Sequence, residues 1–173
     1  DLMALAKWMS DYYCTSVGSA LAAIIPAPLK SGKTSVRARK IKITEEEYAP
    51  TVSLKLTDEQ ERAFREIEES IEKEEFKVFL LHGITSSGKT EVYLQCVADV
   101  LARGKNAIVL IPEISLTPQT VERFKSRFGE KVAVFHSQMR GGKRFEEWKS
   151  IKDGAARIVV GARSAVFAPI ADL

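Results

Sequence analysis

Cysteine, tryptophan and histidine are scarce in this chain, and both long apolar runs and a strong net charge are missing. The 173 residues include two cysteines, two tryptophans and two histidines, and the formal net charge is +3. Cys14 and Cys96 match no metal-binding or redox spacing, which favours reduced thiols in a cytoplasm. The apolar runs are far shorter than the roughly 20 residues that span a bilayer, so no membrane segment is expected. The mild net charge leaves the class of partner undecided.

The distribution of charge is more informative than its sum. Residues 30–42 contain six basic residues and no acid, and Glu45, Glu46 and Glu47 follow at once. Such a pair of opposite runs is typical of a solvated linker, and the alternative is an arm that contacts phosphates. The chain begins at Asp1 and not at a methionine, so we expect it to be a piece of a longer protein.

Three regions follow from the spacing of apolar residues. Residues 2–13 and 17–25 predict two short helices, the second ended by Pro26 and Pro28. Residues 27–53 show no sustained period, apart from a possible short strand at 36–43. The predicted division is a small helical segment at residues 1–33, a linker at 34–53 and a larger unit at 54–173.

Residues 54–173 alternate between predicted helices and short apolar strands. The strands are expected within KVFLLHG (77–83), NAIVLIP (106–112), VAVFH (132–136) and ARIVVGA (156–162), and the helices at 57–71, 89–102, 118–128 and 142–151. Strands that are continuous apolar runs and alternate with helices indicate a parallel sheet covered by helices on both faces. The residues therefore predict an α/β fold.

Ser-Gly-Lys-Thr occurs twice, at residues 31–34 and 87–90. A phosphate-binding loop also needs a strand before it, a glycine five residues before the second glycine, and a helix that begins at the lysine. These parts aim backbone N–H groups and the positive end of the helix at the phosphates. The sequence GITSSGKT at 83–90 has all of them, with Gly83 and Gly88 at the required spacing. The first copy has Ala27 in place of the first glycine and no strand before it, so we interpret it as a coincidence.

A nucleotide at residues 83–90 assigns chemical roles to this loop. Lys89 would bind the β- and γ-phosphates, the Thr90 hydroxyl would bind Mg²⁺, and N–H groups of residues 85–90 would form the cradle. Lys89 and Thr90 are therefore the predicted catalytic residues, and ATP and Mg²⁺ the predicted cofactors. An ordinary strand-to-helix turn would leave a buried lysine without an anion, which is costly. The carboxylate that holds the metal is either Glu113, directly after VLIP, or lies beyond residue 173.

Five segments together resemble superfamily 2 helicases and, within them, the bacterial replication-restart helicases of the PriA family. They are LTDEQ (56–60), LLHGITSSGKTEVYL (80–94), LIPEISLTPQ (110–119), FHSQM (135–139) and IVVGARSAVFAP (158–169). The segment LAKWMSDYYCTSVGSAL (5–21) also resembles the start of that family's winged-helix DNA-binding region. The resemblance implies a RecA-like P-loop NTPase lobe at 54–173, preceded by a helical remnant of the DNA-binding region at 1–33.

The resemblance also implies a role for each residue that matches a family motif. Gln60 matches an adenine-reading glutamine, although Thr57 and Gln60 equally fit a helix capping box. The family usually has glycine where Ser86 or Ser87 stands, and serine is tolerable there if the backbone angle is ordinary. The implied ATP and magnesium site comprises Gln60, Gly83, Thr85, Ser86, Ser87, Gly88, Lys89, Thr90 and Glu91. The implied DNA-contacting residues are Pro112, Glu113, Thr117, Gln119, His136, Arg163 and Ser164.

Loops at the carboxyl ends of neighbouring parallel strands share one rim, so we expect the ATP loop and the DNA-contacting loops to lie side by side. In that arrangement Glu113 orients a loop and does not bind the metal. His136 can equally be an ordinary surface histidine. Trp8 and Trp148 are expected to fill helix faces more readily than to stack on bases.

The resemblance implies a cytoplasmic, ATP-dependent DNA helicase that acts in replication restart and primosome assembly. Its implied partners are forked and single-stranded DNA, primosome proteins and single-strand-binding proteins, with no membrane. The chain stops before the family's Asp-Glu motif, second lobe and zinc region, so we expect this piece to hydrolyse little ATP and to hold no zinc. Two other functions stay open: a small-molecule kinase with Glu113 on the metal, and a non-enzymatic nucleic-acid-binding module.

Overall fold

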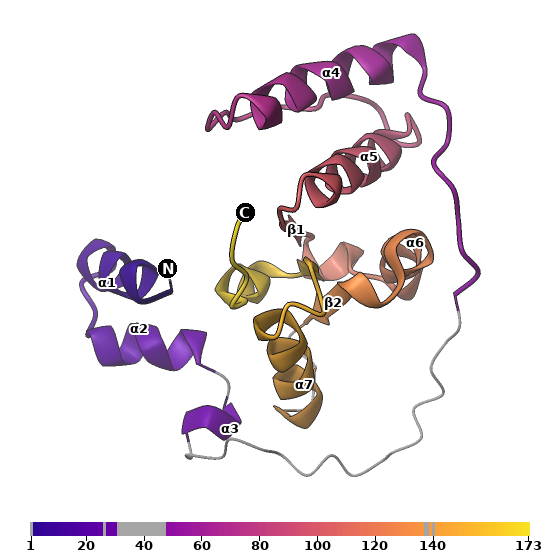
Figure 1. Cartoon of the computed structure of the whole chain (residues 1–173). Coiled ribbons are helices and arrows are strands. Elements are labelled where there is room, and N and C mark those ends of the chain that lie inside the picture. Colours follow the sequence, from indigo (N-terminus) through magenta and orange to yellow (C-terminus); the bar gives the residue numbers. More distant parts are fainter. Residues whose placement is uncertain (1, 26, 31–47, 137–138, 140) are drawn as a thin grey trace.

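The computed structural model describes residues 2–25, 27–30, 48–136, 139 and 141–173. At its centre lies a parallel sheet of three strands in the order β1-β3-β2 (Figure 1). The strands are β1 (Ala107–Leu110), β2 (Val132–Phe135) and β3 (Ile158–Gly161). All four residues of β3 are buried, as expected for a continuous apolar run in the middle of a parallel sheet. The predicted α/β class is confirmed.

The helices of the larger unit match the predicted ones closely. They are α4 (Asp58–Glu72), α5 (Lys89–Ala102), α6 (Pro118–Phe128) and α7 (Gly141–Lys152), with short 3₁₀ turns η1 (Glu113–Ser115), η2 (Gly129–Lys131) and η3 (Arg163–Phe167). The ends of α6 show why: the Thr117 hydroxyl accepts a hydrogen bond from the Thr120 N–H, and Gly129 ends the helix with a positive φ of 59°. Both are standard helix-end chemistry.

Two apolar layers cover the sheet, one on each face. Helices α5 and α6 pack on one face, and α7 with η3 packs on the other, because alternate residues of β3 point to opposite sides. The first layer is formed by Leu94, Val97, Leu101, Phe124, Val132, Ile158 and Val160. The second is formed by Ala133, Phe135, Ile151, Ala156, Val159, Ala165 and Ala168.

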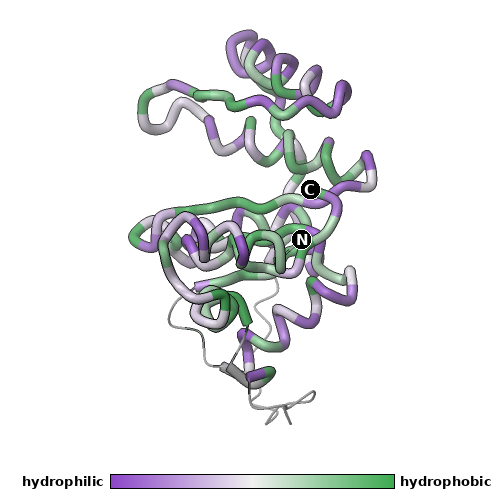
Figure 2. Tube along the Cα trace, turned by 90° about the vertical axis from the view of Figure 1, so that its left-hand side faces the viewer, coloured by the Kyte–Doolittle hydropathy of each residue, from purple (hydrophilic) through white to green (hydrophobic). Residues whose placement is uncertain are grey.

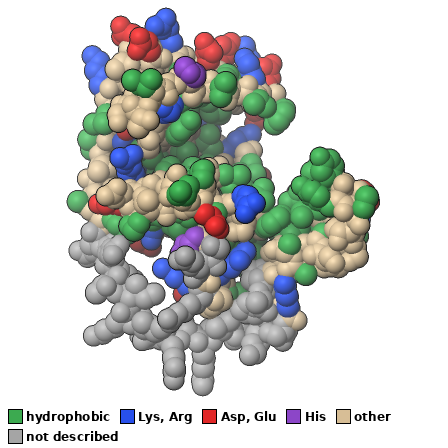
Figure 3. Space-filling model, turned by 180° about the vertical axis from the view of Figure 1, so that it is seen from behind, with side chains coloured by type: hydrophobic (Ala, Val, Ile, Leu, Met, Phe, Trp, Pro, Cys, Tyr) green, Lys and Arg blue, Asp and Glu red, His purple; other side chains and the backbone are tan. Residues whose placement is uncertain are grey.

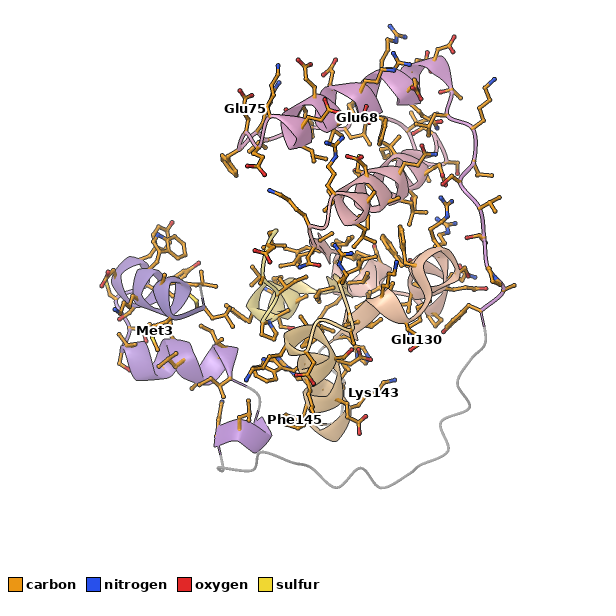
Figure 4. The ribbon with its side chains drawn as sticks, in the orientation of Figure 1. Met3, Glu68, Glu75, Glu130, Lys143 and Phe145 are labelled. Carbon is orange, nitrogen blue, oxygen red and sulfur yellow. The ribbon has the colours of Figure 1, made fainter. Side chains whose placement is uncertain are left out.

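Helix α4 lies outside α5 as a further layer (Figure 1). It is strongly hydrophilic along most of its length, as the purple coil at the top of Figure 2 shows. Glu68 lies on its side toward α5 (Figure 4). On α5, burial and then the nearby charges of Asp99 and Glu68 raise the pKa of the Cys96 thiol to about 11, so this thiol stays protonated at neutral pH.

One predicted strand is absent. Residues 78–81, expected to lead into the phosphate loop as a strand, have no strand structure, and Val78 and Leu80 are 81% and 91% exposed. An apolar run becomes a strand only where a neighbour takes up its N–H and C=O groups, and this run pairs with neither β1 nor β2. Seen from behind, hydrophobic side chains surround a hollow beneath the upper helical layer (Figure 3).

The N-terminal helices α1 (Leu2–Tyr12), α2 (Val17–Ile24) and α3 (Ala27–Lys30) stand beside the sheet (Figure 1). Their small core of Ala6, Ala20 and Ile24 packs against Phe167 of η3. No helix among the described residues has the length and apolarity to cross a membrane. The strand predicted at 36–43, and most of the predicted linker, lie outside the described residues.

The two tryptophans differ in their surroundings. Trp148 packs against the apolar layer under α7, as expected. The expectation that Trp8 fills a helix face is wrong, because its side chain is 54% exposed. It stacks on Tyr12 with the ring centroids 4.9 Å apart.

Gly161, at the end of β3, has no space for a side chain. A Cβ atom there would collide with the Phe135 carbonyl oxygen and lie 2.9 Å from Ala165 Cβ. Gly161→Ala should therefore lower the free energy of unfolding by roughly 1–3 kcal/mol, the usual cost of overpacking. Urea denaturation measures this. Gly141→Ala is the matched control: nothing lies within 4 Å of its Cβ, and alanine in a helix should be neutral or stabilising. Equal midpoints for both variants would contradict the packing at Gly161.

Candidate nucleotide-binding site

The loop at residues 83–90 is shaped by its two glycines. The Ser87 N–H donates to the Ile84 carbonyl oxygen at 3.3 Å, and Gly88 turns the chain into α5 with a φ of 78°. A Cβ atom on Gly83 would lie 2.7 Å from Ser87 Oγ, and one on Gly88 would collide with the Gln60 amide. The positive φ of Gly88 favours glycine there, whereas the close contacts at both positions are with the ends of the Ser87 and Gln60 side chains, which can move.

The Lys89 amine lies inside this loop. Its Nζ donates to the carbonyl oxygens of Gly83 and Ile84 at 2.6 and 2.7 Å, and lies 3.4 Å from Ser87 Oγ. Among the described residues it forms no ion pair with a carboxylate. An unpaired cation, held by carbonyl dipoles at the positive end of a helix, fits a phosphate group. Thr90, the predicted magnesium ligand, is the next residue of α5.

Ser86 departs from the sequence expectation. Its φ is 68°, in the left-handed region, whereas Ser87 has an ordinary angle. The condition under which serine would be tolerable, an ordinary backbone angle, is met at Ser87 and not at Ser86, so Ser86 is the position where a glycine would be unstrained. Thr85 and Ser86 are exposed, so the tip of the loop is open to solvent.

Gln60 has two roles in the structure. It forms the predicted capping box with Thr57, in which Gln60 Oε1 accepts from the Thr57 N–H at 2.9 Å and Thr57 Oγ1 accepts from the Gln60 N–H at 3.4 Å. Its Nε2 also donates to the Ser87 carbonyl oxygen at 2.9 Å, which ties α4 to the loop. Contact with adenine stays a prediction.

Glu91 is engaged within the protein. Its carboxylate accepts two hydrogen bonds from Arg127 of α6 at 3.0 and 3.2 Å, one from the Leu54 N–H at 3.1 Å and one from Gln95 at 2.9 Å. Its own N–H donates to the Gly88 carbonyl oxygen. The predicted contact of Glu91 with nucleotide is therefore less favoured by the geometry than a role in holding the first turn of α5. Arg127 and Gln95 had no sequence signal, since neither belongs to the phosphate-loop pattern.

The carboxyl ends of the three strands are level with one another. Leu110, Gly161 and Phe135 are aligned partners, the Ile111 N–H donates to the Gly161 carbonyl oxygen, and the Ala162 N–H donates to that of Phe135. The loops that follow therefore leave from one rim, and the residues predicted to contact DNA lie in them; the contact itself stays a prediction. Pro112, Glu113, Thr117, Gln119 and Arg163 are exposed there, and His136 and Ser164 are partly buried.

The loop at 83–90 connects to this rim through α5 and α6. Arg127, in the last turn of α6, contacts Glu91, whereas Thr117 and Gln119 lie at the other end of the helix. Ten residues of helix separate Thr117 from Arg127, which is about 15 Å at 1.5 Å per residue. Direct side-by-side contact of the ATP loop with the DNA-contacting loops stays a prediction; the contact in the structure is to the far end of α6.

Comparison with known proteins identifies the family to which the chain belongs. Residues 53–172 match the family described as type III restriction enzyme, res subunit. The chain belongs to this family. That range contains the sheet, the loop at 83–90 and the rim, and the family's domain is a RecA-like helicase lobe.

The most similar curated relatives include three named replication restart protein PriA. The chain is 58% identical to that of Bacillus subtilis over 126 residues (73% of the chain, 16% of the relative). It is 39% identical to that of Treponema pallidum over 174 residues (97% and 24%) and 32% identical to that of Rickettsia conorii over 173 residues (100% and 25%). The resemblance to PriA is confirmed, and the chain spans between a sixth and a quarter of these relatives.

The left-handed backbone angle of Ser86 predicts how substitutions at this position change the stability of the protein. Asparagine tolerates this region and a β-branched residue does not, so Ser86→Val should lower the free energy of unfolding by about 1 kcal/mol relative to Ser86→Asn. Thermal unfolding of the two variants tests this. The same pair at Thr85, which has no positive φ, is the control and should differ less. A larger difference at Thr85 than at Ser86 would overturn the assignment.

Proposed function

We propose that this chain is the ATP-binding part of a DNA helicase that acts in replication restart. The observation that carries the proposal is the Lys89 amine, held inside the loop at the start of α5 with no carboxylate partner in the described part of the chain, which is similar to PriA proteins. A nucleotide's phosphates would replace the two carbonyl oxygens as partners of this amine. The N–H groups at the start of α5 would complete the cradle.

The chemistry supplied by bound ATP and Mg²⁺ is phosphoryl transfer to water, which depends on positioning and charge stabilisation. In this chain Lys89 would bind the phosphates, Thr90 would bind the metal, and Gln60 would hold the loop through Ser87. Glu113, exposed on η1 at the rim, is proposed to orient its loop.

DNA is the proposed second substrate. Arg163, Ser164 and Thr117 lie in loops that leave one rim, together with the N-terminal end of α6, and can donate hydrogen bonds to successive phosphates. We propose forked and single-stranded DNA as the ligands, primosome and single-strand-binding proteins as partners of the whole protein, and the cytoplasm as its location.

Lys89→Ala should weaken ATP binding about 10- to 100-fold, since the charge-assisted bonds to phosphate are lost. Fluorescent ATP-analogue titration with Mg²⁺ measures this. Lys105→Ala is the control, because Lys105 lies past the other end of α5 and pairs with Glu74. Unchanged affinity in Lys89→Ala would refute the ATP site and would favour a non-enzymatic module.

Arg163→Ala should weaken binding of single-stranded DNA roughly fivefold and reduce the slope of log affinity against log salt by about 1, as expected for one lost phosphate contact. Fluorescence anisotropy at several salt concentrations measures both quantities. Arg62→Ala on α4, where Arg62 bonds only the Asp58 carbonyl oxygen among its described partners, should change neither. An unchanged salt slope in Arg163→Ala would place the DNA elsewhere.

The helicase and the kinase are separated by the dependence of ATP hydrolysis on DNA. In the full-length protein, single-stranded DNA should raise the rate of hydrolysis, and Lys89→Ala should abolish that rate. A rate that is independent of DNA would count against the helicase and favour a small-molecule kinase.

A further inference from the structure

A buried ion pair joins the ATP-loop end of α5 to α6. Arg127 and Glu91 approach to 3.0 Å, and their side chains are only 8% and 11% exposed. Every other ion pair among the described residues has at least one side chain that is 31% exposed or more. Solvent screens those surface pairs strongly, whereas the Glu91–Arg127 pair is largely shielded from water and is screened less.

The same two side chains also hold the segment that leads into α4. The Glu91 carboxylate accepts from the Leu54 N–H at 3.1 Å, and Arg127 donates to Ser53 Oγ at 2.8 Å. Gln95 adds a bond to the Leu54 carbonyl oxygen at 2.7 Å. The pair is thus the common contact of α5, α6 and residues 53–54.

The composition of this cluster argues against a purely stabilising role. Removing two charges from water costs free energy that their attraction only partly returns, so apolar residues would hold two helices together at least as well. Arg127 Nε is in addition buried without an acceptor among the described residues. In some proteins such a pair fixes one arrangement of the elements that it joins.

Ionisation of Glu91 is maintained by its neighbours. Burial favours the neutral acid, but hydrogen bonds from Gln95, Arg127 and the Leu54 N–H together outweigh it and lower the pKa of Glu91. The pair is therefore charged at neutral pH. With a folded-state pKa below the unfolded one, its contribution is complete above the ordinary pKa and is lost only as the pH falls through the lowered value.

The ion pair lies between two functional candidates, the first turn of α5 and the N-terminal end of α6. Glu91 follows Lys89 and Thr90 directly, so the ion pair holds the first turn of α5, where the predicted phosphate and metal contacts lie. Arg127 ends a continuous helix whose first turn contains Gln119, with Thr117 as its cap. A helix of this length moves as one body, so a displacement at one end reaches the other.

We propose that Glu91 and Arg127 are positioning residues that couple the ATP loop to the DNA-contacting end of α6. This inference rests on the proposed helicase function. DNA bound at Thr117 and Gln119 would fix α6, and the ion pair would pass that constraint to the turn that holds Lys89 and Thr90. Neither side chain contacts ATP or DNA in this scheme, because both are occupied by each other and by residues 53–54.

The test is DNA stimulation of ATP hydrolysis in the full-length protein. Glu91→Ala and Arg127→Met should each lower the ratio of the DNA-stimulated to the DNA-independent rate at least tenfold. The double variant should lose no more than the worse single variant, because the two side chains act as one unit. A merely structural role would lower the melting temperature and leave this ratio unchanged below the transition.

Arg103→Met is the matched control. Arg103 also joins α5 to another helix, since it bonds Glu72 of α4 at 3.1 Å, but it lies at the end of α5 away from the loop. Its removal should leave the ratio within twofold. If Arg103→Met lowers the ratio as much as Arg127→Met does, general loosening of α5 explains the effect and the coupling role is refuted.

Failure of the proposed function and failure of the coupling role give different results in this experiment. If the unaltered protein shows no DNA stimulation, the proposed function fails, and the coupling role fails with it. If stimulation is present and survives in both variants, only the coupling role fails. Should Glu91→Ala not fold, Glu91→Gln keeps an acceptor for Leu54 and Arg127 while it removes the charge. A threefold or greater loss of the ratio in that variant supports the proposal, and an unchanged ratio overturns it.

Discussion

The architecture depends on the complete enclosure of β3. This strand is hydrogen-bonded on both sides, by β1 and β2, and both of its faces are covered by helices. Its last residue, Gly161, lies so close to the Phe135 carbonyl oxygen that the chain has room for no side chain. Three aligned strand ends result, and three motifs far apart in the sequence meet at one rim.

The loop at 83–90 is held in a different way, by contacts with the helices α4 and α5. The run at 76–81 has no strand neighbour, so the usual support from a sheet is missing in the described residues. The loop is instead tied by Gln60 of α4, by the Lys89 amine and by the turn at Gly88. Helix α4, which is hydrophilic and carries none of the predicted phosphate-binding residues, therefore supports the candidate site.

The sequence predicts well those features that depend on neighbouring residues. Both ends of α6 and of α5 were predictable because caps and glycines are local signals, and the sheet was predictable because parallel strands are continuous apolar runs. The prediction of a strand at 78–81 was wrong for a non-local reason. An apolar run in the sequence does not show whether another strand lies beside it. The expectation for Trp8 was wrong for a similar reason. The sequence shows that a residue lies on one face of a helix, but not which part of the protein covers that face.

Within the candidate site, Lys89 has local partners that the sequence predicts, whereas Glu91 has a distant partner that it does not. The position of Lys89 is fixed by bonds to residues five and six positions before it, so the motif alone describes its surroundings. Glu91 is only two residues further on, yet its partner Arg127 is 36 residues away, and no spacing rule connects them. Only the packing of α6 against α5 brings the two together.

Helix α6 is stabilised at both of its ends, by different residues. Thr117 caps its N-terminal end, and Arg127 at its C-terminal end complements the negative end of the helix dipole as well as the Glu91 carboxylate. A cation in the last turn thus stabilises the helix and anchors it to the first turn of α5 with one side chain. Lysine would retain the dipole interaction but not the two bonds to the carboxylate and the bond to Ser53, because only a guanidinium presents several donors in one plane. The anchoring, and not the helix itself, is what requires arginine at this position.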